Sequence, residues 1–237
     1  MVENQSNKKN SGGIVSIVKK PISRRNFLVF TGISAAAVTL GIQGCKEDTI
    51  TTPSGTGVDL GSGDIGILNY AYALEQLEAA FYIQAVSTPY SGMPASELSI
   101  LTDIRDHEIA HRDFFKAAIP SSNRIPDLEV NFSSINFSDR ASVLNTAKAF
   151  EDLGVSAYNG AGYYIADANY LLLAGKIVSV EARHAAAIRD LLSPKSASFA
   201  GDDIIDGAGL DLQKKPSQVL PVAATYLRTT VTANNLP

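Results

Sequence analysis

The chain of 237 residues contains one cysteine and no tryptophan. A single cysteine excludes an internal disulfide framework and any zinc or iron–sulfur site built from several thiolates. Hydrophobic residues make up 45% of the sequence, which is too many for an intrinsically disordered chain. The length and composition therefore predict one globular domain with additional segments.

Basic residues are scarce beyond the first 44 positions. That stretch holds six of the 20 lysines and arginines and a single acid, Glu3. The remainder carries 14 basic and 23 acidic residues, and the whole chain has a formal net charge of −4. An acidic body argues against nucleic acid as a partner, because such binding depends on neutralising phosphates.

The N-terminus has the layout of an export signal. Residues 1–25 are polar and basic, and residues 26–44 (NFLVFTGISAAAVTLGIQG) are apolar and uncharged. The sequence SRRNFL around Arg24 and Arg25 resembles the twin-arginine export motif, whose route carries folded proteins, often with a metal in place. The alternative is an uncleaved membrane anchor, although 19 weakly apolar residues barely span a bilayer.

The only cysteine, Cys45, ends the sequence GIQGC, which resembles a lipoprotein box. On that interpretation Cys45 is the lipidated first residue of an exported protein that is anchored to a membrane, in the periplasm or at the cell surface. The alternative is a buried or incidental thiol. Residues 46–63 are rich in Gly, Ser, Thr and Pro, so they predict a flexible tether between the signal segment, residues 1–45, and the domain.

The body of the chain, residues 64–193, predicts four helices, at about 64–86, 95–118, 139–164 and 167–193. Their candidate N-caps include Asp64, either Ser138 or Asp139, and Asp167. The connection between the second and third helices, residues 120–138, is too long for a tight turn. The sequence therefore predicts an all-α four-helix bundle with one long crossover, and residues 194–237 predict a C-terminal extension that packs on it with one short helix.

Two of the three histidines follow a glutamate by three residues, in the pairs Glu108–His111 and Glu181–His184. Residues three apart share one face of a helix, so each pair presents a carboxylate and an imidazole together. These pairs fall on the second and fourth predicted helices.

The first and third predicted helices resemble each other. Residues 68–86 and 144–162 share eight identities in 19 positions. The shared residues include Glu75 with Glu151, and Tyr82 with Tyr158. The order Glu, Glu-x-x-His, Glu, Glu-x-x-His indicates a duplicated helix pair.

One Glu from each of two helices and Glu-x-x-His from each of the other two resemble the ligand set of ferritin-like di-iron carboxylate proteins. The phrases ALEQLEAAFY, FEDLGVSAY and IVSVEARHAAAIRDLL also resemble the bacterial ferritin-like-domain family related to desiccation-related proteins. Buried carboxylates need neutralising cations, and imidazole suits iron or manganese. The resemblance implies a ferritin-like bundle in which two iron ions, or manganese, are bound by Glu75, Glu108, His111, Glu151, Glu181 and His184.

Other residues near this set have expected roles. We expect Glu108 and Glu181 to bridge the two metals, and Tyr82 and Tyr158 to donate hydrogen bonds to the ligands. Glu78 also lies on the inner face of the first helix and is an alternate ligand. Its counterpart in the repeat is Gly154, so the symmetry favours Glu75.

The sequence His107-Glu108-Ile109-Ala110-His111 also matches the H-E-x-x-H helix of zinc metallopeptidases. On that interpretation His107 and His111 bind zinc and Glu108 is the general base. No third ligand follows at the metzincin spacing, and the second Glu-x-x-His stays unexplained. We therefore expect His107 at the helix surface beside the site. A plain helical bundle with incidental Glu and His is the remaining alternative.

The function beyond metal binding divides into three hypotheses. The first is a redox enzyme that oxidises Fe(II) or reacts with O₂ or peroxide. The second is a non-catalytic metal-binding or stress-protective protein, as the resemblance to desiccation-related proteins allows. The third is iron storage, which needs a closed cage and fits poorly with a tethered chain. A homodimer is compatible with the first two.

Overall fold

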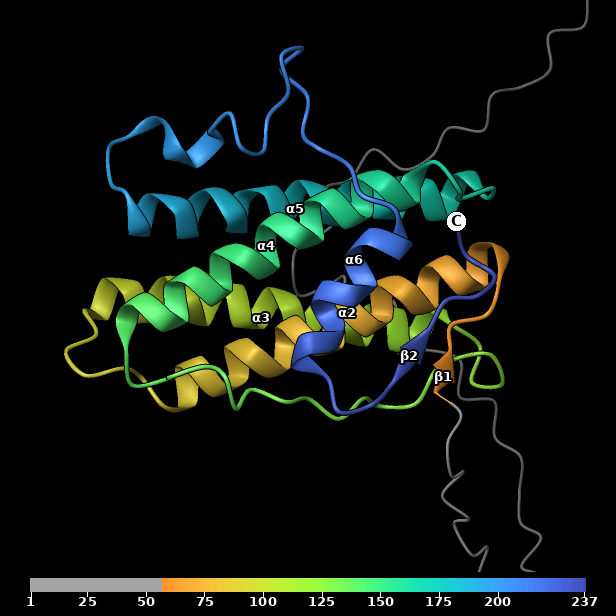
Figure 1. Cartoon of the computed structure of the whole chain (residues 1–237), viewed down its shortest axis with the longest axis horizontal. Helices are drawn as coiled ribbons and strands as arrows, with labels where there is room; N and C mark the ends of the chain where they lie inside the picture. Colours follow the sequence, from red (N-terminus) through yellow and green to blue (C-terminus); the bar gives the residue numbers. More distant parts are fainter. Residues whose placement is uncertain (1–56) are drawn as a thin grey trace, which may run out of the picture. The chain divides into compact units, whose positions relative to one another are not determined.

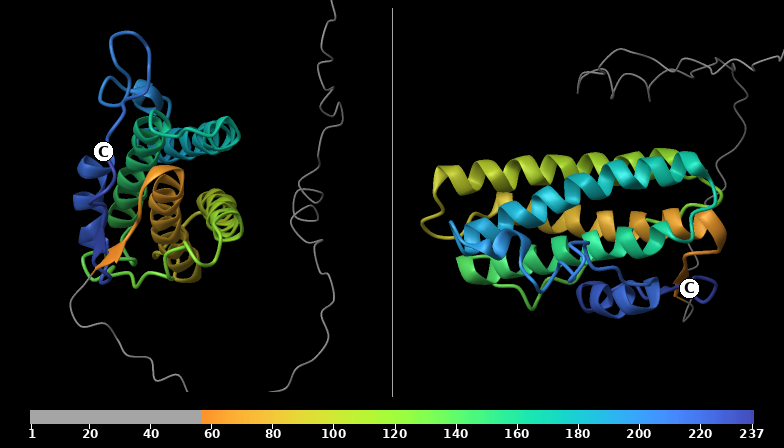
Figure 2. Two further views of the ribbon diagram at one scale, coloured as in Figure 1. Left: turned by 90° about the vertical axis from the view of Figure 1, so that its right-hand side faces the viewer. Right: turned by 90° about the horizontal axis from the view of Figure 1, so that it is seen from above.

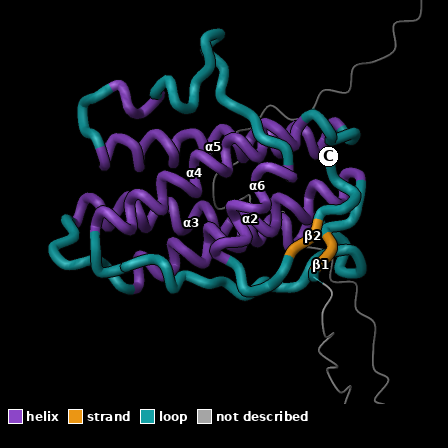
Figure 3. Tube along the Cα trace, in the orientation of Figure 1, coloured by secondary structure: helices purple, strands orange, loops and turns teal. Residues whose placement is uncertain are grey.

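The computed structural model describes residues 57–237, and Arg24, Arg25, Cys45 and the signal segment lie outside them. Four long helices dominate the described part (Figures 1 and 3). They are α2 (Gly63–Ser87), α3 (Ala95–Ala118), α4 (Arg140–Gly162) and α5 (Ala168–Leu192). The smaller elements are β1 (Val58–Asp59), η1 (Ala197–Ala200), α6 (Pro216–Ala223), η2 (Ala224–Tyr226) and β2 (Val231–Thr232).

The long helices form two hairpins, α2 with α3 and α4 with α5, that lie side by side (Figure 2). Each hairpin has a short connection, whereas residues 119–139 cross from one hairpin to the other along the outside of the bundle (Figure 1). The predicted all-α four-helix bundle with a long crossover between its second and third helices is confirmed. Within residues 57–237, no helix is both long and apolar enough to cross a membrane.

Two predicted N-caps hold the starts of their helices. The Asp139 carboxylate accepts a hydrogen bond from the Ser142 amide at 2.8 Å, so Asp139 and not Ser138 caps α4. The Asp167 carboxylate accepts from the Asn169 amide at 2.7 Å and caps α5. Each cap satisfies an amide at the start of a helix that has no partner within the helix.

The predicted cap of the first helix, Asp64, is wrong. Ser62 occupies the N-cap position, and α2 begins at Gly63. The Asp64 carboxylate instead accepts hydrogen bonds from the amides of Ala166 and Asp167, both at 2.8 Å. Asp64 therefore joins the start of α2 to the connection between α4 and α5.

The end of the predicted tether belongs to the domain. Val58–Asp59 pairs in parallel with Val231–Thr232, and the Leu60 side chain is fully buried. The packed domain therefore begins at residue 57, and not at residue 64 as the composition suggested. A two-residue strand has no sequence period, so its pairing depends on the C-terminal partner.

Aromatic side chains fix the crossover to the bundle. Phe132 and Phe137 from the crossover contact Phe81 of α2, with ring centroids 6.1 and 5.8 Å away. Phe81 also contacts Phe150 of α4 at 5.2 Å. The C-terminal extension lies against α2 and α4 through α6, in which Val219 is fully buried. The crossover therefore packs on α2, and the extension packs on both α2 and α4.

Gly160 is a close contact between α4 and the extension. A Cβ at this position would lie 1.9 Å from the Lys214 carbonyl oxygen. Gly160→Ala is therefore expected to lower the free energy of unfolding by about 1–3 kcal/mol, as overpacking does. Urea unfolding of the full chain measures this change.

Gly175→Ala is the matched control, because no atom lies within 4 Å of the Cβ that it would add on α5. It is expected to stabilise the helix by about 0.5–1 kcal/mol, since alanine loses less entropy than glycine. Equal stability of the two variants would contradict the close packing at Gly160.

Candidate metal centre

Six side chains from all four long helices meet inside the bundle, near its middle. Glu75 comes from α2 and Glu151 from α4, while α3 and α5 each supply a Glu-x-x-His pair. All four carboxylates are 0% exposed and His184 is 4% exposed. The side chain of His111 is 13% exposed. The residues are Glu75, Glu108, His111, Glu151, Glu181 and His184.

These six residues form two overlapping groups, in each of which one ligand atom per residue lies within 4.8 Å of the others. One group contains Glu75 and His111, and the other contains Glu151 and His184. Glu108 and Glu181 belong to both groups. The arrangement could hold a cation in each group, with the two shared carboxylates between them.

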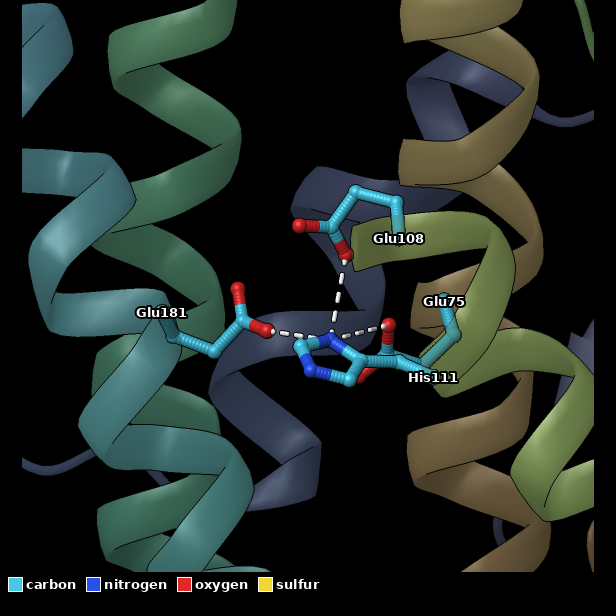
Figure 4. A group of neighbouring side chains, drawn as sticks. All are labelled: Glu75, Glu108, His111 and Glu181. Atoms are coloured by element: carbon cyan, nitrogen blue, oxygen red, sulfur yellow. Dashed lines mark ion pairs between the residues drawn. The ribbon is translucent and has the colours of Figure 1, made fainter. Parts of the chain in front are cut away.

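The first group surrounds His111 (Figure 4). Its Nδ1 atom lies 2.9 Å from Glu181 Oε1 and 3.5 Å from Oε2 of both Glu75 and Glu108. The three carboxylates approach this nitrogen from three different helices.

The second group surrounds His184. Its Nδ1 atom lies 2.8 Å from Glu108 Oε1, 3.5 Å from Glu151 Oε2 and 3.9 Å from Glu181 Oε2. The two oxygens of Glu108 therefore face different histidines, and so do the two oxygens of Glu181. This is the geometry expected of bridging carboxylates.

Each of the other two carboxylates has one oxygen occupied by a tyrosine. Tyr82 of α2 donates a 2.5 Å hydrogen bond to Glu151 Oε1 on α4. Tyr158 of α4 donates in turn to Glu75 Oε1 on α2. Because each hydrogen bond crosses to the other hairpin, the tyrosines orient both carboxylates and leave one oxygen of each facing inward.

The inward-facing atoms fit a pair of cations. Eight buried atoms of the six residues make no hydrogen bond to any other residue within the described range 57–237. They are Glu75 Oε2, both oxygens of Glu108, His111 Nδ1, Glu151 Oε2, both oxygens of Glu181 and His184 Nδ1. Buried polar atoms are normally paired, and buried charges cost several kcal/mol each when they are not. Carboxylate oxygens and imidazole nitrogens are ligands for iron and manganese.

The crowding of carboxylates changes the proton affinity of the site. Burial and the neighbouring Glu181 raise the pKa of Glu108. Burial alone would lower the pKa of His184, but the carboxylates of Glu108, Glu151 and Glu181 raise it to about 12. Protons therefore supply the positive charge when cations are removed.

Glu78 lies next to this cluster without belonging to either group of ligand atoms. Its Oε1 atom would be 3.0 Å from a Cβ added to Gly154, so the missing side chain of Gly154 provides the space that Glu78 occupies. Burial and the carboxylate of Glu181 raise the pKa of Glu78. The break in the sequence repeat therefore gives one half of the site an extra buried carboxyl group.

His107 lies at the helix surface, as expected, and it also contacts a member of the cluster. Although it is exposed, its Nδ1 lies 2.9 Å from His184 Nε2, and the two rings are stacked with centroids 5.1 Å apart. His184 Nε2 can donate to His107 while His184 Nδ1 faces the carboxylates. The repeat carries Val180 at the matching position, which is the sequence signal for this difference.

The geometry does not favour the zinc-peptidase interpretation. That interpretation requires His107 and His111 to face one cation, but His107 lies behind His184 and is in neither group of ligand atoms. Glu108, which would act as the general base, is shared by both groups.

Comparison with known families agrees with this architecture. The family model of a ferritin-like domain matches residues 63–194, which is more than half of the chain. The chain belongs to the ferritin-like domain family. No curated protein matches the chain. The matched residues of the ferritin-like domain include α2 to α5 and all six side chains of the two groups.

Removal of metal is expected to make the stability of the ferritin-like domain depend on pH. Glu78, Glu108 and His184 have raised pKa values, so the folded chain binds more protons than the unfolded chain above about pH 4.5. The free energy of unfolding of chelated protein therefore falls as the pH rises from 5 to 8. The lowered pKa of Glu181, about 2, acts only below that window.

Metal replaces these protons, so its stabilising effect grows over the same range. The difference in Tm between Mn(II)-loaded and chelated protein is expected to widen by at least about 3 °C between pH 5 and pH 8, or roughly 1 kcal/mol for a chain of this size. A Tm difference that does not change with pH would contradict the inference that protons balance the carboxylates in the absence of metal.

His107→Leu removes the partner of His184 Nε2 and is expected to lower metal affinity by about 10- to 100-fold, as loss of such partners does. Arg183→Gln changes an exposed neighbour of His184 and is expected to leave the affinity unchanged. Competition with a chelating indicator for Mn(II) measures both. Equal affinities in the two variants would show that His107 does not hold His184.

Proposed function

We propose that this chain is an exported, membrane-anchored ferritin-like protein that binds two iron ions, or iron and manganese. We further propose that the loaded site oxidises Fe(II) or reacts with O₂ or peroxide. The observation that supports the metal pair most strongly is the sharing of Glu108 and Glu181 between the two groups of ligand atoms. A single-metal site would need neither shared carboxylates nor two histidines.

Iron bound at this site would supply electrons to O₂ or peroxide, and the protein controls what surrounds it. Tyr82 and Tyr158 hold two carboxylates in place across the hairpins. The complete burial of the four carboxylates keeps bulk water away from the ligands. His107 holds the outward nitrogen of His184, so a proton at His184 Nε2 has a defined acceptor that reaches solvent.

The remaining features of the proposal concern the N-terminal segment. Arg24 and Arg25 would direct export of the folded chain, and Cys45 would carry the lipid. Export after folding suits a buried site, because the metal would be bound before the chain leaves the cytoplasm.

The complete enclosure of the carboxylates also favours a second function, a metal-binding or stress-protective protein without turnover. Two metals held by four helices would fasten both hairpins together and raise the stability of the bundle. The two functions differ in whether an Fe(II)-loaded sample consumes O₂ or peroxide repeatedly.

Metal analysis by mass spectrometry tests the proposed site. Full-length protein made in the cytoplasm is expected to hold about two iron or manganese ions per chain. The double variant Glu151→Ala, His184→Ala is expected to lose them, because it removes two of the four residues of one group and leaves Glu108 and Glu181, which both groups share, without the second cation. Circular dichroism checks that the variant stays helical.

Glu78→Gln is the matched control, since it replaces a buried carboxyl group outside both groups of ligand atoms. It is expected to keep both metals, and their loss would make Glu78 a ligand. One zinc ion that survives the double variant would support the peptidase interpretation. No metal in any sample after incubation with Fe(II) would contradict the proposed centre.

A further inference from the structure

Large apolar side chains are exposed where α4 is connected to α5. Tyr163 is 78% exposed, although it directly follows the last residue of α4. Leu172, in the second turn of α5, is 60% exposed, and its neighbour Leu171 is 46% exposed. Together with Tyr164, these residues place two aromatic and two aliphatic side chains at one end of the bundle, and we call them the hairpin tip.

Two pockets meet at Tyr163. One, of about 320 Å³, lies between α4 and α5 and includes Leu171. The other, of about 470 Å³, is lined by Tyr163, Tyr164, Lys214 and Lys215 and three neighbouring residues. Neither lysine forms an ion pair with any residue in the described range 57–237. Positive charge is therefore available directly beside the apolar tip.

The same end of the bundle receives the N-terminal part of the chain. The Asp64 carboxylate accepts from the amides of Ala166 and Asp167, which places the start of α2 against the connection between α4 and α5. β1, which precedes α2, lies at this end as well (Figures 1 and 2). Any attachment through residues before Gly57 is therefore made at the end of the bundle that carries the hairpin tip.

The length of the preceding segment limits how far this end can move from its attachment. Eleven residues lie between Cys45 and Gly57. A fully extended chain of that length reaches about 40 Å, which is close to the length of one of the four long helices. An anchor at Cys45 would thus keep the end that carries the hairpin tip within about 40 Å of the membrane.

We propose that the hairpin tip is a docking surface for an anionic lipid bilayer, with Tyr163, Tyr164, Leu171 and Leu172 in the interface and Lys214 and Lys215 on the lipid phosphates. This inference rests on the lipid anchor at Cys45 in the proposed function. Tyrosine rings are favoured at the boundary between headgroups and acyl chains, and lysines are attracted to anionic headgroups. The anchor raises the local concentration of the tip at the bilayer, so a small surface is sufficient for docking.

The absence of tryptophan from the chain allows a direct test. Tyr163→Trp places the chain's only tryptophan at the tip, where it can be excited selectively, and Phe199→Trp places one at a residue that is also exposed, at 55%. Phe199 follows the C-terminal end of α5, whereas the tip is at its N-terminal end. The 25 residues of α5 separate the two ends by about 37 Å.

Both variants are made as the full lipidated chain and added to vesicles of anionic phosphatidylglycerol that contain lipids with brominated acyl chains. The fluorescence of the Tyr163→Trp variant is expected to shift to the blue and to be quenched at least twofold. The Phe199→Trp variant is expected to show neither change. Lys214→Glu with Lys215→Glu, added to the Tyr163→Trp chain, is expected to halve the quenching, because it places negative charge on the phosphates.

Flotation of the same samples separates the outcomes. Protein that floats with the vesicles but shows no quenching of the Tyr163→Trp variant would overturn the docking surface and leave the anchor intact. Protein that does not float would overturn both. A blue shift that occurs without vesicles and grows with protein concentration would assign the tip to a second copy of the chain and overturn the lipid proposal.

Discussion

The packing of this domain depends on how the charges of six ionisable side chains inside the bundle are balanced. Four carboxylates and two imidazoles lie between the helices, and the two carboxylates that belong to both groups, Glu108 and Glu181, are completely buried. Such a cluster is unfavourable unless cations or protons balance it. The tyrosines on α2 and α4 and the contact between His107 and His184 hold side chains of the cluster in place.

The duplicated hairpins give the site an approximate symmetry that the sequence breaks at two places. Glu78 faces Gly154, so only one half has an additional buried carboxyl group. His107 contacts His184, while the matching position in the other hairpin is Val180. The two groups of ligand atoms therefore differ in their surroundings even though each contains three carboxylates and one imidazole. Two cations held there would be expected to bind with different affinities.

The sequence predicts most of the fold and the six residues of the cluster because both follow from spacing along a helix. Apolar periods identify the four helices, and Glu-x-x-His places two ligand types on one face. The role of Asp64 could not be found this way, since its partners, the amides of Ala166 and Asp167, are far away in the chain. His107 likewise depends on how α3 faces α5, which local spacing does not contain. β1 is too short to have a period, and it exists only because β2 pairs with it.

The crossover of residues 119–139 has a consequence for how the protein holds together. It is the only covalent connection between the hairpins, and each hairpin carries three of the six residues of the cluster. The domain is thus equivalent to two half-sites fused in one chain. After a cut within the crossover, the two halves would have to associate as separate molecules. They would lose the high effective concentration that the crossover gives each half near the other. If the cluster binds the proposed cations, reassembly of the two fragments would depend on the concentration of metal.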